Sequence, residues 1–298
     1  MTPQFPIQLP DYPITRSPDS RAPAAIGRSA RLELVFEARR RRTILAHAYA
    51  EPPFRVGRAF ELGDAAYLIV VCSGPGIFAG DSLRQSIRVA RGARAVLTSQ
   101  SALQVHPSGA SSAAAPAVVH HAYAVEEDAE LHCHWDPVIP FAGARLEQRF
   151  DIQIAESGRL YWSDAVMAGR VSRGEAWRFA SLAHELRLRV GASLAYLERY
   201  TLTPDERAPQ RRWLAGDASY LATALVRHPD VTRDAVDALH RSMAELDSVS
   251  GGVDLVAARL AVARLAARDG ASFGRARTSY RAIALRSIFG GPELAARK

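Results

Sequence analysis

The sequence predicts a mainly β protein of the α+β class, in which stacked β-sheet layers follow a β-helix-like topology and a few helices occupy the C-terminal third. Apolar and polar residues alternate from Arg31 onward, as they do in half-buried strands. A strand–turn–strand pattern recurs between Ile87 and Trp162, and its copies can bury their apolar faces only by stacking. Helical periodicity of convincing length is confined to residues after 205.

The N-terminal segment differs from the rest of the chain. Residues 1–28 carry six prolines and no sustained periodicity, so we expect them to be extended or disordered. Residues 29–298 are predicted to form a single β-scaffold domain, with helices mainly after residue 205. The first strand of this domain runs into four consecutive arginines, Arg39–Arg42, which we interpret as a solvated hairpin tip.

The central strands show two kinds of pattern. Tyr67–Val71 is a continuous apolar run, typical of a buried strand, whereas Leu83–Val89 alternates between apolar and polar residues. The strand–turn–strand pattern then covers the segments Ile87–Thr98, Tyr123–His134 and Ile152–Trp162. Their uneven spacing argues against identical repeats and favours two-stranded layers joined by connections of variable length.

The last third is predicted to add strands first and helices afterwards. Leu182–Val190 alternates as a strand and is followed by a turn at Gly191. Val231–Leu246 has one apolar face at helical spacing. Val253–Ala267 fits either an alanine-rich helix or strands, and Ser279–Phe289 is predicted as a final basic helix.

Composition argues against several classes of protein. The net charge is +7, but the basic residues are arginines except for the final Lys298, and they are scattered rather than gathered into the stripe that nucleic acid requires. The longest apolar run, Ala65–Cys72, is too short to span a membrane. Cys72 and Cys133 are the only cysteines, so we expect a cytoplasmic protein without a disulfide framework.

Two glycine-rich signatures invite an enzymatic interpretation. The first contains Gly74, Gly76 and Gly80, and the second contains Gly169 and Gly174. A dinucleotide-binding turn needs a helix after its glycines, but the sequence predicts a strand there. A P-loop is excluded because that motif needs a lysine within the chain, and the only lysine here is the final residue, Lys298. The structural alternative is that these glycines permit the positive φ of sharp turns.

Acidic residues lie near both signatures. Asp81 follows the first and would cap or bond its turn. Asp164 and Glu175 lie near the second, and a carboxylate pair is a means of acid–base catalysis, but an ion pair of Glu175 with Arg170 or Arg173 is an equally good account. No nucleophile has a credible base nearby, so we expect no catalytic residues. An uncharacterised β-scaffold enzyme is the alternative.

Histidines gather in the region 106–134. On a strand, His132 and His134 point to one face, and two imidazoles can hold a nickel, copper or zinc ion. A stand-alone metal-binding module is therefore a second alternative. The competing interpretation is that these are ordinary strand histidines, because no further ligands occur at the spacing of a closed zinc site.

Five segments together resemble one known family, the UreD/UreH urease accessory proteins. They are Arg55-Val56 with Phe60, Gly74–Asp81, Gly92–Thr98, Pro137–Ala144 and Gly169–Glu175. The resemblance implies a mostly β, non-catalytic scaffold that assembles with UreF and UreG type proteins on the apo-urease subunits and helps to insert nickel into urease. It also implies no tightly bound cofactor, with nickel in contact only transiently.

Metal transfer through such a scaffold would need a polar path, because a bare cation cannot cross an apolar core. On this analogy we expect Asp81, Glu175, Asp164 and Arg170 to serve the metal path or partner docking. His132 and His134 are further metal candidates.

Overall fold

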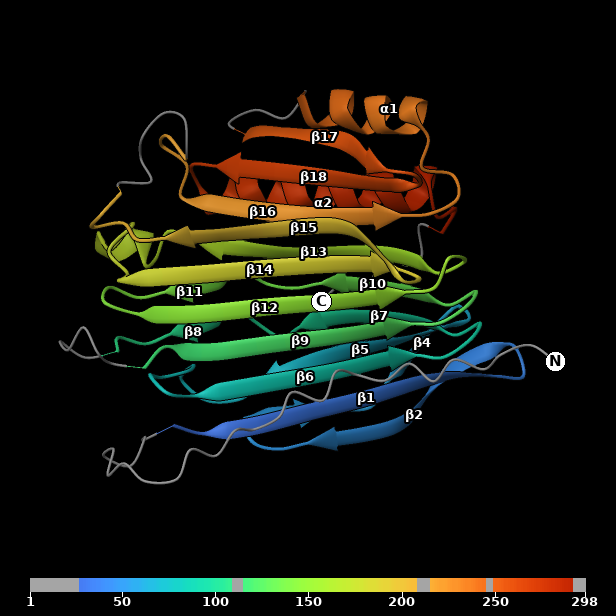
Figure 1. The fold of residues 1–298 in the computed structure, drawn as a ribbon, viewed down its shortest axis with the longest axis horizontal. Coiled ribbons are helices and arrows are strands. Elements are labelled where there is room, and N and C mark those ends of the chain that lie inside the picture. Colours follow the sequence, from blue (N-terminus) through green and yellow to red (C-terminus); the bar gives the residue numbers. More distant parts are fainter. Residues whose placement is uncertain (1–26, 109–114, 208–214, 245–248, 292–298) are drawn as a thin grey trace.

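Two β-sheets face each other in the computed structural model, which describes residues 27–108, 115–207, 215–244 and 249–291 (Figure 1). The expected N-terminal segment lies almost wholly outside these residues, so its extended character and the single-domain boundary stay predictions. The sheets have seven and eleven strands.

The seven-stranded sheet lies nearer the viewer in Figure 1, and we call it the front sheet. Its strands run in the order β15-β14-β12-β9-β6-β1-β2. They are β1 (Ser29–Arg39), β2 (Arg42–Ala50), β6 (Ser82–Val89), β9 (Ala117–Val125), β12 (Arg145–Ile154), β14 (Ser181–Val190) and β15 (Ser193–Leu202).

The eleven-stranded back sheet follows the order β17-β18-β16-β13-β10-β7-β5-β3, with three short strands beside this path. Its main strands are β3 (Phe54–Val56), β5 (Ala65–Cys72), β7 (Arg94–Ser99), β10 (Glu130–His134), β13 (Arg159–Met167), β16 (Tyr220–Arg227), β17 (Val249–Ala257) and β18 (Leu260–Ala267). The short strands are β4 (Phe60–Leu62), β8 (Leu103–Val105) and β11 (Val138–Pro140).

Between β5 and β14 the chain alternates between the two sheets. Successive turns of this path stack in parallel, so that Gln85 of β6 lies beside His121 of β9 and Leu97 of β7 lies beside Cys133 of β10. The predicted mainly β fold with stacked layers and β-helix-like topology is therefore confirmed. In each predicted strand–turn–strand unit, the turn joins strands of different sheets and does not close a hairpin.

The arginine-rich tip is a hairpin, as predicted. Strands β1 and β2 pair antiparallel, and the turn between them places Arg40 and Arg41 at positive φ. The charged side chains at this tip are exposed to water.

The main core lies between the two sheets. The alternating strands turn their apolar residues inward, and Leu34, Ile87, Ile152 and Leu188 of the front sheet are at most 2% exposed. Trp162 meets them from the back sheet and is fully buried. Burial of each such side chain contributes about 1.5–3 kcal/mol, so the inward row accounts for much of the stability of the stack.

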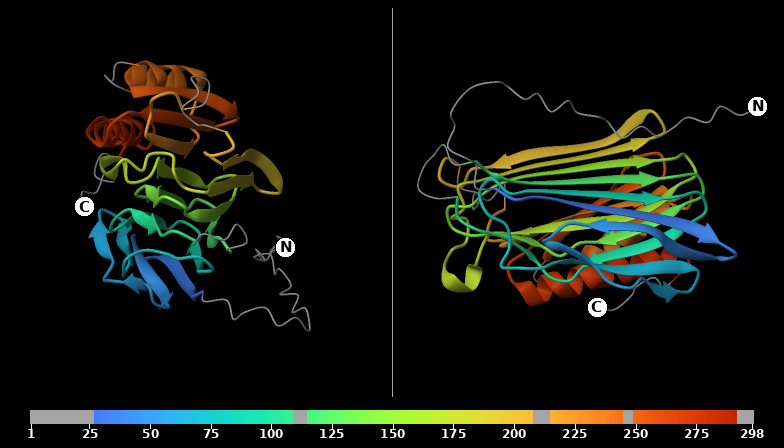
Figure 2. Two further views of the ribbon diagram at one scale, coloured as in Figure 1. Left: turned by 90° about the vertical axis from the view of Figure 1, so that its left-hand side faces the viewer. Right: turned by 90° about the horizontal axis from the view of Figure 1, so that it is seen from below.

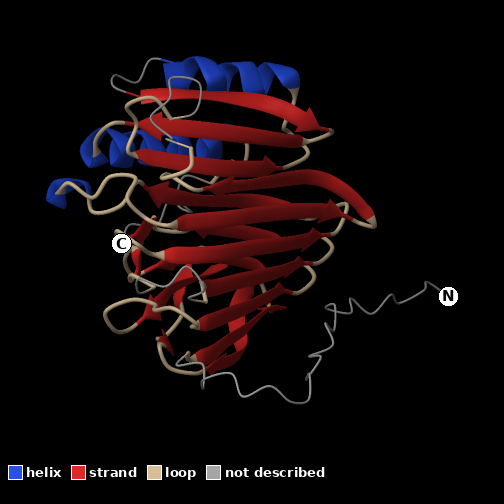
Figure 3. Cartoon of the chain, turned by 60° about the vertical axis from the view of Figure 1, so that its left-hand side comes forward, coloured by secondary structure: helices blue, strands red, loops and turns tan. Residues whose placement is uncertain are grey.

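Two α-helices cover the outer face of the back sheet near β16–β18 (Figure 3). Helix α1 (Arg233–Ala244) packs against β17, and α2 (Gly270–Ser287) contributes Phe273 and Tyr280 to the same second core. A single-turn 3₁₀ helix, η1 (Val171–Arg173), lies between β13 and β14. No helix among the described residues combines the length and apolar character needed to cross a bilayer.

The structure decides one open C-terminal expectation and corrects another. The ambiguous segment Val253–Ala267 forms strands, most of β17 and all of β18. The final helix begins nine residues before the predicted Ser279, because Asp269 caps it by accepting a 2.8 Å hydrogen bond from the Ser272 amide. Gly270 and Gly274 weaken the helical signal of this first part.

Candidate functional site

Both glycine signatures lie at the same end of the two-sheet stack, on the left in Figure 1 and facing the viewer in the left view of Figure 2. The first connects β5 to β6, and the second connects β13 to β14. Strands β8 and β11 lie between them and pair in parallel. We call this region, formed by residues 73–81, 103–108, 137–143 and 168–180, the glycine end.

All five predicted glycines adopt positive φ. At Gly76 a Cβ would lie 2.3 Å from the carbonyl oxygen of Gln104, and at Gly169 it would lie 2.5 Å from that of Glu175. A larger residue at either position would therefore push two backbone segments apart. The strand β6 follows the first signature directly, so the helix of a dinucleotide-binding turn is missing there.

A stack of rings and one guanidinium joins the loops of the glycine end. The ring of His106 stacks on Phe78 at 4.4 Å between centroids and meets Phe141 edge-on at 4.9 Å. The Arg170 guanidinium lies over the ring of Phe141, 4.0 Å from its centroid. Phe78 remains 44% exposed, so the stack presents an apolar surface to solvent.

Two of the predicted acidic residues also lie at the glycine end, and both have protein partners. The Asp81 carboxylate accepts hydrogen bonds from the amides of Arg28 and Phe78, at 2.8 and 2.9 Å. Glu175 accepts one from the Arg170 guanidinium at 2.7 Å, and this bond lowers the pKa of Glu175. Their geometry holds the loops in place, as the structural interpretation expects.

Asp164 lies elsewhere, between the sheets, where it lines two cavities. The first has a volume of about 120 Å³ and reaches the surface at the exposed Gly74. The second has a volume of about 480 Å³ and extends between β15 and β16–β18 to the exposed Arg264. Both are lined by Asp164 and Ala165, so the Asp164 carboxyl group borders both cavities.

The Asp164 side chain is buried with little to stabilise its charge. The residue is 7% exposed, and its closest ionisable partner is the His184 ring, with Nδ1 3.9 Å away. Burial, and then the nearby Glu198, raise the pKa of Asp164 to about 8. Near neutral pH the carboxyl group is therefore mostly protonated.

Two histidine–glutamine pairs on the front sheet lie in this interior, and three of their residues, Gln85, His121 and Gln148, line the first cavity. Gln85 Nε2 lies 3.0 Å from His121 Nε2, and Gln148 Nε2 lies 2.7 Å from His184 Nδ1. Burial lowers the pKa of His121 to about 3 and that of His184 to about 4. Both rings are neutral near pH 7, and the ring nitrogen that faces each glutamine accepts a hydrogen bond from its amide nitrogen.

The sequence held a signal for these interior residues that site prediction missed. Each occupies an inward position of an alternating strand where an apolar residue is expected: Gln85 lies between Leu83 and Ile87, and His184 lies between Leu182 and Leu186. A polar residue in such a position must find partners inside the fold.

The predicted metal pair His132 and His134 lies on the opposite, outer face of the back sheet. His132 Nε2 contacts Glu130 Oε1 at 2.8 Å, and His134 Nδ1 contacts Ser163 Oγ at 3.0 Å. The phenyl ring of Phe289 packs against His132. Over the described ranges, no three His, Cys, Asp or Glu side chains are grouped so as to hold a metal ion. Metal binding by this pair stays a prediction.

Comparison with known proteins identifies similar chains. A family model described as "UreD urease accessory protein" matches residues 28–298. The urease accessory protein UreD of Sorangium cellulosum is 34% identical over 205 residues, which is 68% of this chain and 63% of that protein. That of Trichodesmium erythraeum is 33% identical over 150 residues, covering 49% of this chain and 53% of its own.

A third relative aligns over more of its length. The UreD of Lysinibacillus sphaericus is 28% identical over 236 residues, which is 76% of this chain and 86% of that protein. The aligned part of this chain thus spans less than two thirds of the first two relatives and most of the third.

Proposed function

Because the chain belongs to the UreD family of urease accessory proteins, we propose that it is a non-catalytic scaffold for urease maturation. In this role it assembles with UreF and UreG type partners on apo-urease and helps nickel to reach the urease active site. Nickel is the cargo of this process, held only in passing. The observation that supports the proposal most is the pair of interior cavities that both border Asp164.

A route for a divalent cation needs polar groups, because an apolar core offers no interaction that offsets the free energy of removing the ion from water. The interior supplies a carboxyl group at Asp164, neutral imidazoles at His121 and His184, and amides at Gln85 and Gln148. Oxygen and imidazole nitrogen ligands suit nickel. A mixed set of weak ligands favours passage over retention, since an ion that binds too tightly does not leave.

The cysteines agree with a non-catalytic role. Cys133 is fully buried, and burial raises its pKa. Burial also raises the pKa of Cys72, which lines the first cavity. Neither thiol has the lowered pKa that marks a nucleophile.

The glycine end is our candidate for partner docking. It presents the exposed ring of Phe78 at one end of the ring stack and the Arg170–Glu175 ion pair at the other, and so combines an apolar contact with charges of both signs. Aromatic rings and arginines of this kind are enriched at the centres of protein interfaces.

Reconstituted urease activation tests the cation route. The full chain is combined with UreF and UreG type proteins, apo-urease and nickel, and the urease activity that develops is measured. Asp164→Asn preserves the side-chain shape but removes the ionisable oxygen, and it should lower activation to about a tenth or less of the wild-type level, because an amide cannot release a proton to offer the cation a carboxylate.

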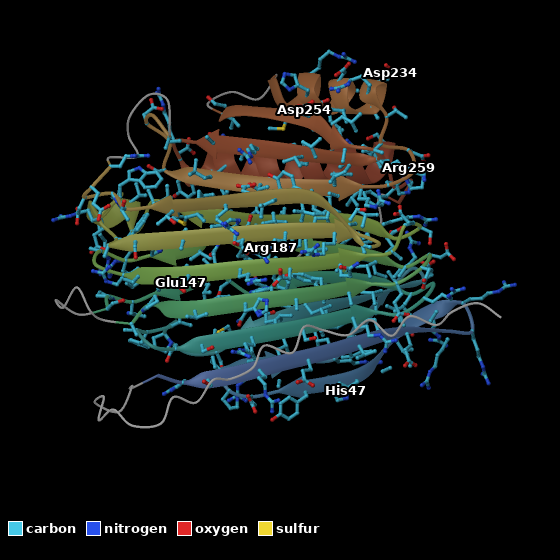
Figure 4. The ribbon with its side chains drawn as sticks, in the orientation of Figure 1. His47, Glu147, Arg187, Asp234, Asp254 and Arg259 are labelled. Carbon is cyan, nitrogen blue, oxygen red and sulfur yellow. The ribbon has the colours of Figure 1, made fainter. Side chains whose placement is uncertain are left out.

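The control is Glu147→Gln, which removes a carboxylate from the outer face of the front sheet (Figure 4). It should leave activation unchanged. Full activation by Asp164→Asn would contradict the interior route, and failure of the wild-type chain to form a complex with its partners would contradict the scaffold itself.

A further inference from the structure

At the mouth of the second cavity, a carboxylate is already paired with a positively charged side chain. Glu198 of β15 is 9% exposed at its side chain, and its Oε2 accepts a 3.2 Å hydrogen bond from Nη2 of Arg264 on β18. The same guanidinium nitrogen donates to the Tyr196 hydroxyl at 3.0 Å. The Arg264 side chain itself is 63% exposed. The anion is therefore inside and its cation is at the surface.

The sheet register aligns this pair with Asp164. On the back sheet, Asp164 of β13 lies beside Thr223 of β16, which lies beside Arg264 of β18. Glu198 faces this row from the front sheet, and its Oε1 accepts a 3.4 Å hydrogen bond from the Thr223 hydroxyl. All four residues line the second cavity. The carboxyl groups of Asp164 and Glu198 thus face one polar space, and the Arg264 guanidinium is paired with that of Glu198.

The other carboxyl group, that of Asp164, is only weakly stabilised, since its ion-pair neighbour His184 lies 3.9 Å away. Asp164 is more than nine-tenths buried, and among the described residues none other than Asp164 itself is found to donate a hydrogen bond to its carboxyl oxygens. A buried polar group in this state calls for a ligand that the protein alone does not provide. Carboxylate oxygens are the ligands that a divalent cation takes most readily.

We propose that Arg264 is a tethered cation that competes with the metal cargo for Glu198, and so sets the affinity of the second cavity for a divalent cation. This inference rests on the proposed function, in which nickel passes through the interior. While the guanidinium is in place, the cavity offers the ion one carboxyl group. When Arg264 swings outward, Glu198 becomes available and the ion has two. Competition keeps the bound ion exchangeable, as a passage requires.

A purely structural ion pair is the alternative, and the same strand provides one for comparison. Arg199 of β15 contacts Glu185 of β14 at 2.6 Å on the outer face of the front sheet, away from the cavities. Exposed pairs of this kind add little to stability and have no access to the interior. Arg199→Gln therefore removes one arginine charge from an ion pair on the outer face and serves as the matched control for Arg264→Gln.

The test is binding of Ni²⁺ alone to the full chain by equilibrium dialysis. Arg264→Gln should bind Ni²⁺ about tenfold more tightly than the wild type, because it removes one competing charge next to the site. Arg264→Lys, which keeps the charge without the planar fork, should give an intermediate affinity. Arg199→Gln should bind like the wild type. In the double variant Arg264→Gln with Glu198→Gln the gain should vanish, which separates this site from surface histidines.

Unchanged or weaker binding by Arg264→Gln, or a gain that persists in the double variant, would overturn the role of Arg264. Circular dichroism confirms folding, and Arg264→Lys keeps the test decisive if the glutamine variant does not fold. These outcomes leave urease activation by the wild-type chain untouched, so they are distinct from failure of the proposed function. That failure would appear as no activation, whatever Arg264 does.

Discussion

Protonation of Asp164 links the stability of the fold to pH. Burial raises the pKa of this carboxyl group from the ordinary 3.8 to about 8, and Glu198 adds to the shift while Arg277 opposes it. The folded chain therefore keeps a proton between these values that the unfolded chain has released. Each pH unit across this range then costs the folded state about 1.4 kcal/mol relative to an uncharged side chain.

We expect the stability of the wild type relative to Asp164→Asn to fall as the pH rises from about 4 to about 8. Below this window both the folded and the unfolded chain hold the Asp164 proton, so the wild type has its full stability there. That stability is lost as the pH rises toward the pKa of Asp164 in the folded chain. Urea denaturation of the two chains at a series of pH values measures the difference. Parallel stability curves would show that Asp164 is not buried in the protonated form.

Chemical modification of Cys72 should block the first cavity. Cys72 lines that cavity and is partly exposed, whereas Cys133 is fully buried. A maleimide should therefore modify Cys72 alone, and slowly, because burial raises the pKa of its thiol. The bulky adduct should lower urease activation in the reconstituted system.

Cys72→Ser is the control for this labelling experiment, because it should activate urease normally with or without maleimide. Mass spectrometry confirms the site of modification. Undiminished activation by the fully labelled wild type would mean that the cargo does not use the first cavity.

At the scale of elements, the glycine end depends on the close approach of two loops. Gly76 has φ of 126° and no room for a side chain beside the Gln104 carbonyl, whereas Gly74 has a similar φ of 120° but open space around it. The two positions therefore separate backbone strain from steric clash within one turn.

Gly76→Ala should lower the free energy of unfolding by about 2 kcal/mol or more, because strain and clash both act. Gly74→Ala should cost about 1 kcal/mol, from strain alone. Chemical denaturation of both variants measures the difference. Equal losses would mean that the contact with Gln104 relaxes at no cost and does not hold the loops together.

At the scale of the whole molecule, the back sheet extends past the last strand of the front sheet. Strands β16, β18 and β17 continue beyond β15, and the helices cover only their outer face (Figure 3). The inner face of this extension is where the second cavity and the Glu198–Arg264 pair lie. The cavity is thus a consequence of two sheets of unequal width.

The sequence by itself determined the local features. Alternation identified β1, β6 and β14, the recurrent pattern identified the stacked turns of the chain, and the arginine run identified the hairpin tip. Periodicity is a property of neighbouring residues, so it survives without knowledge of the rest of the fold. The same reasoning failed for Val253–Ala267, where small residues suit helix and strand alike, and their pairing partners decided the outcome.

Only the tertiary structure decided which polar residues meet. Asp81, Glu175 and Arg170 lie together at the glycine end, whereas Asp164 joins Glu198 and residues of the front sheet in the interior. The sequence proposed Asp164 but gave no sign of its partners, because strands far apart in the chain become neighbours through sheet order. Side chains from facing sheets meet only once both registers are fixed, and no local pattern encodes that distance.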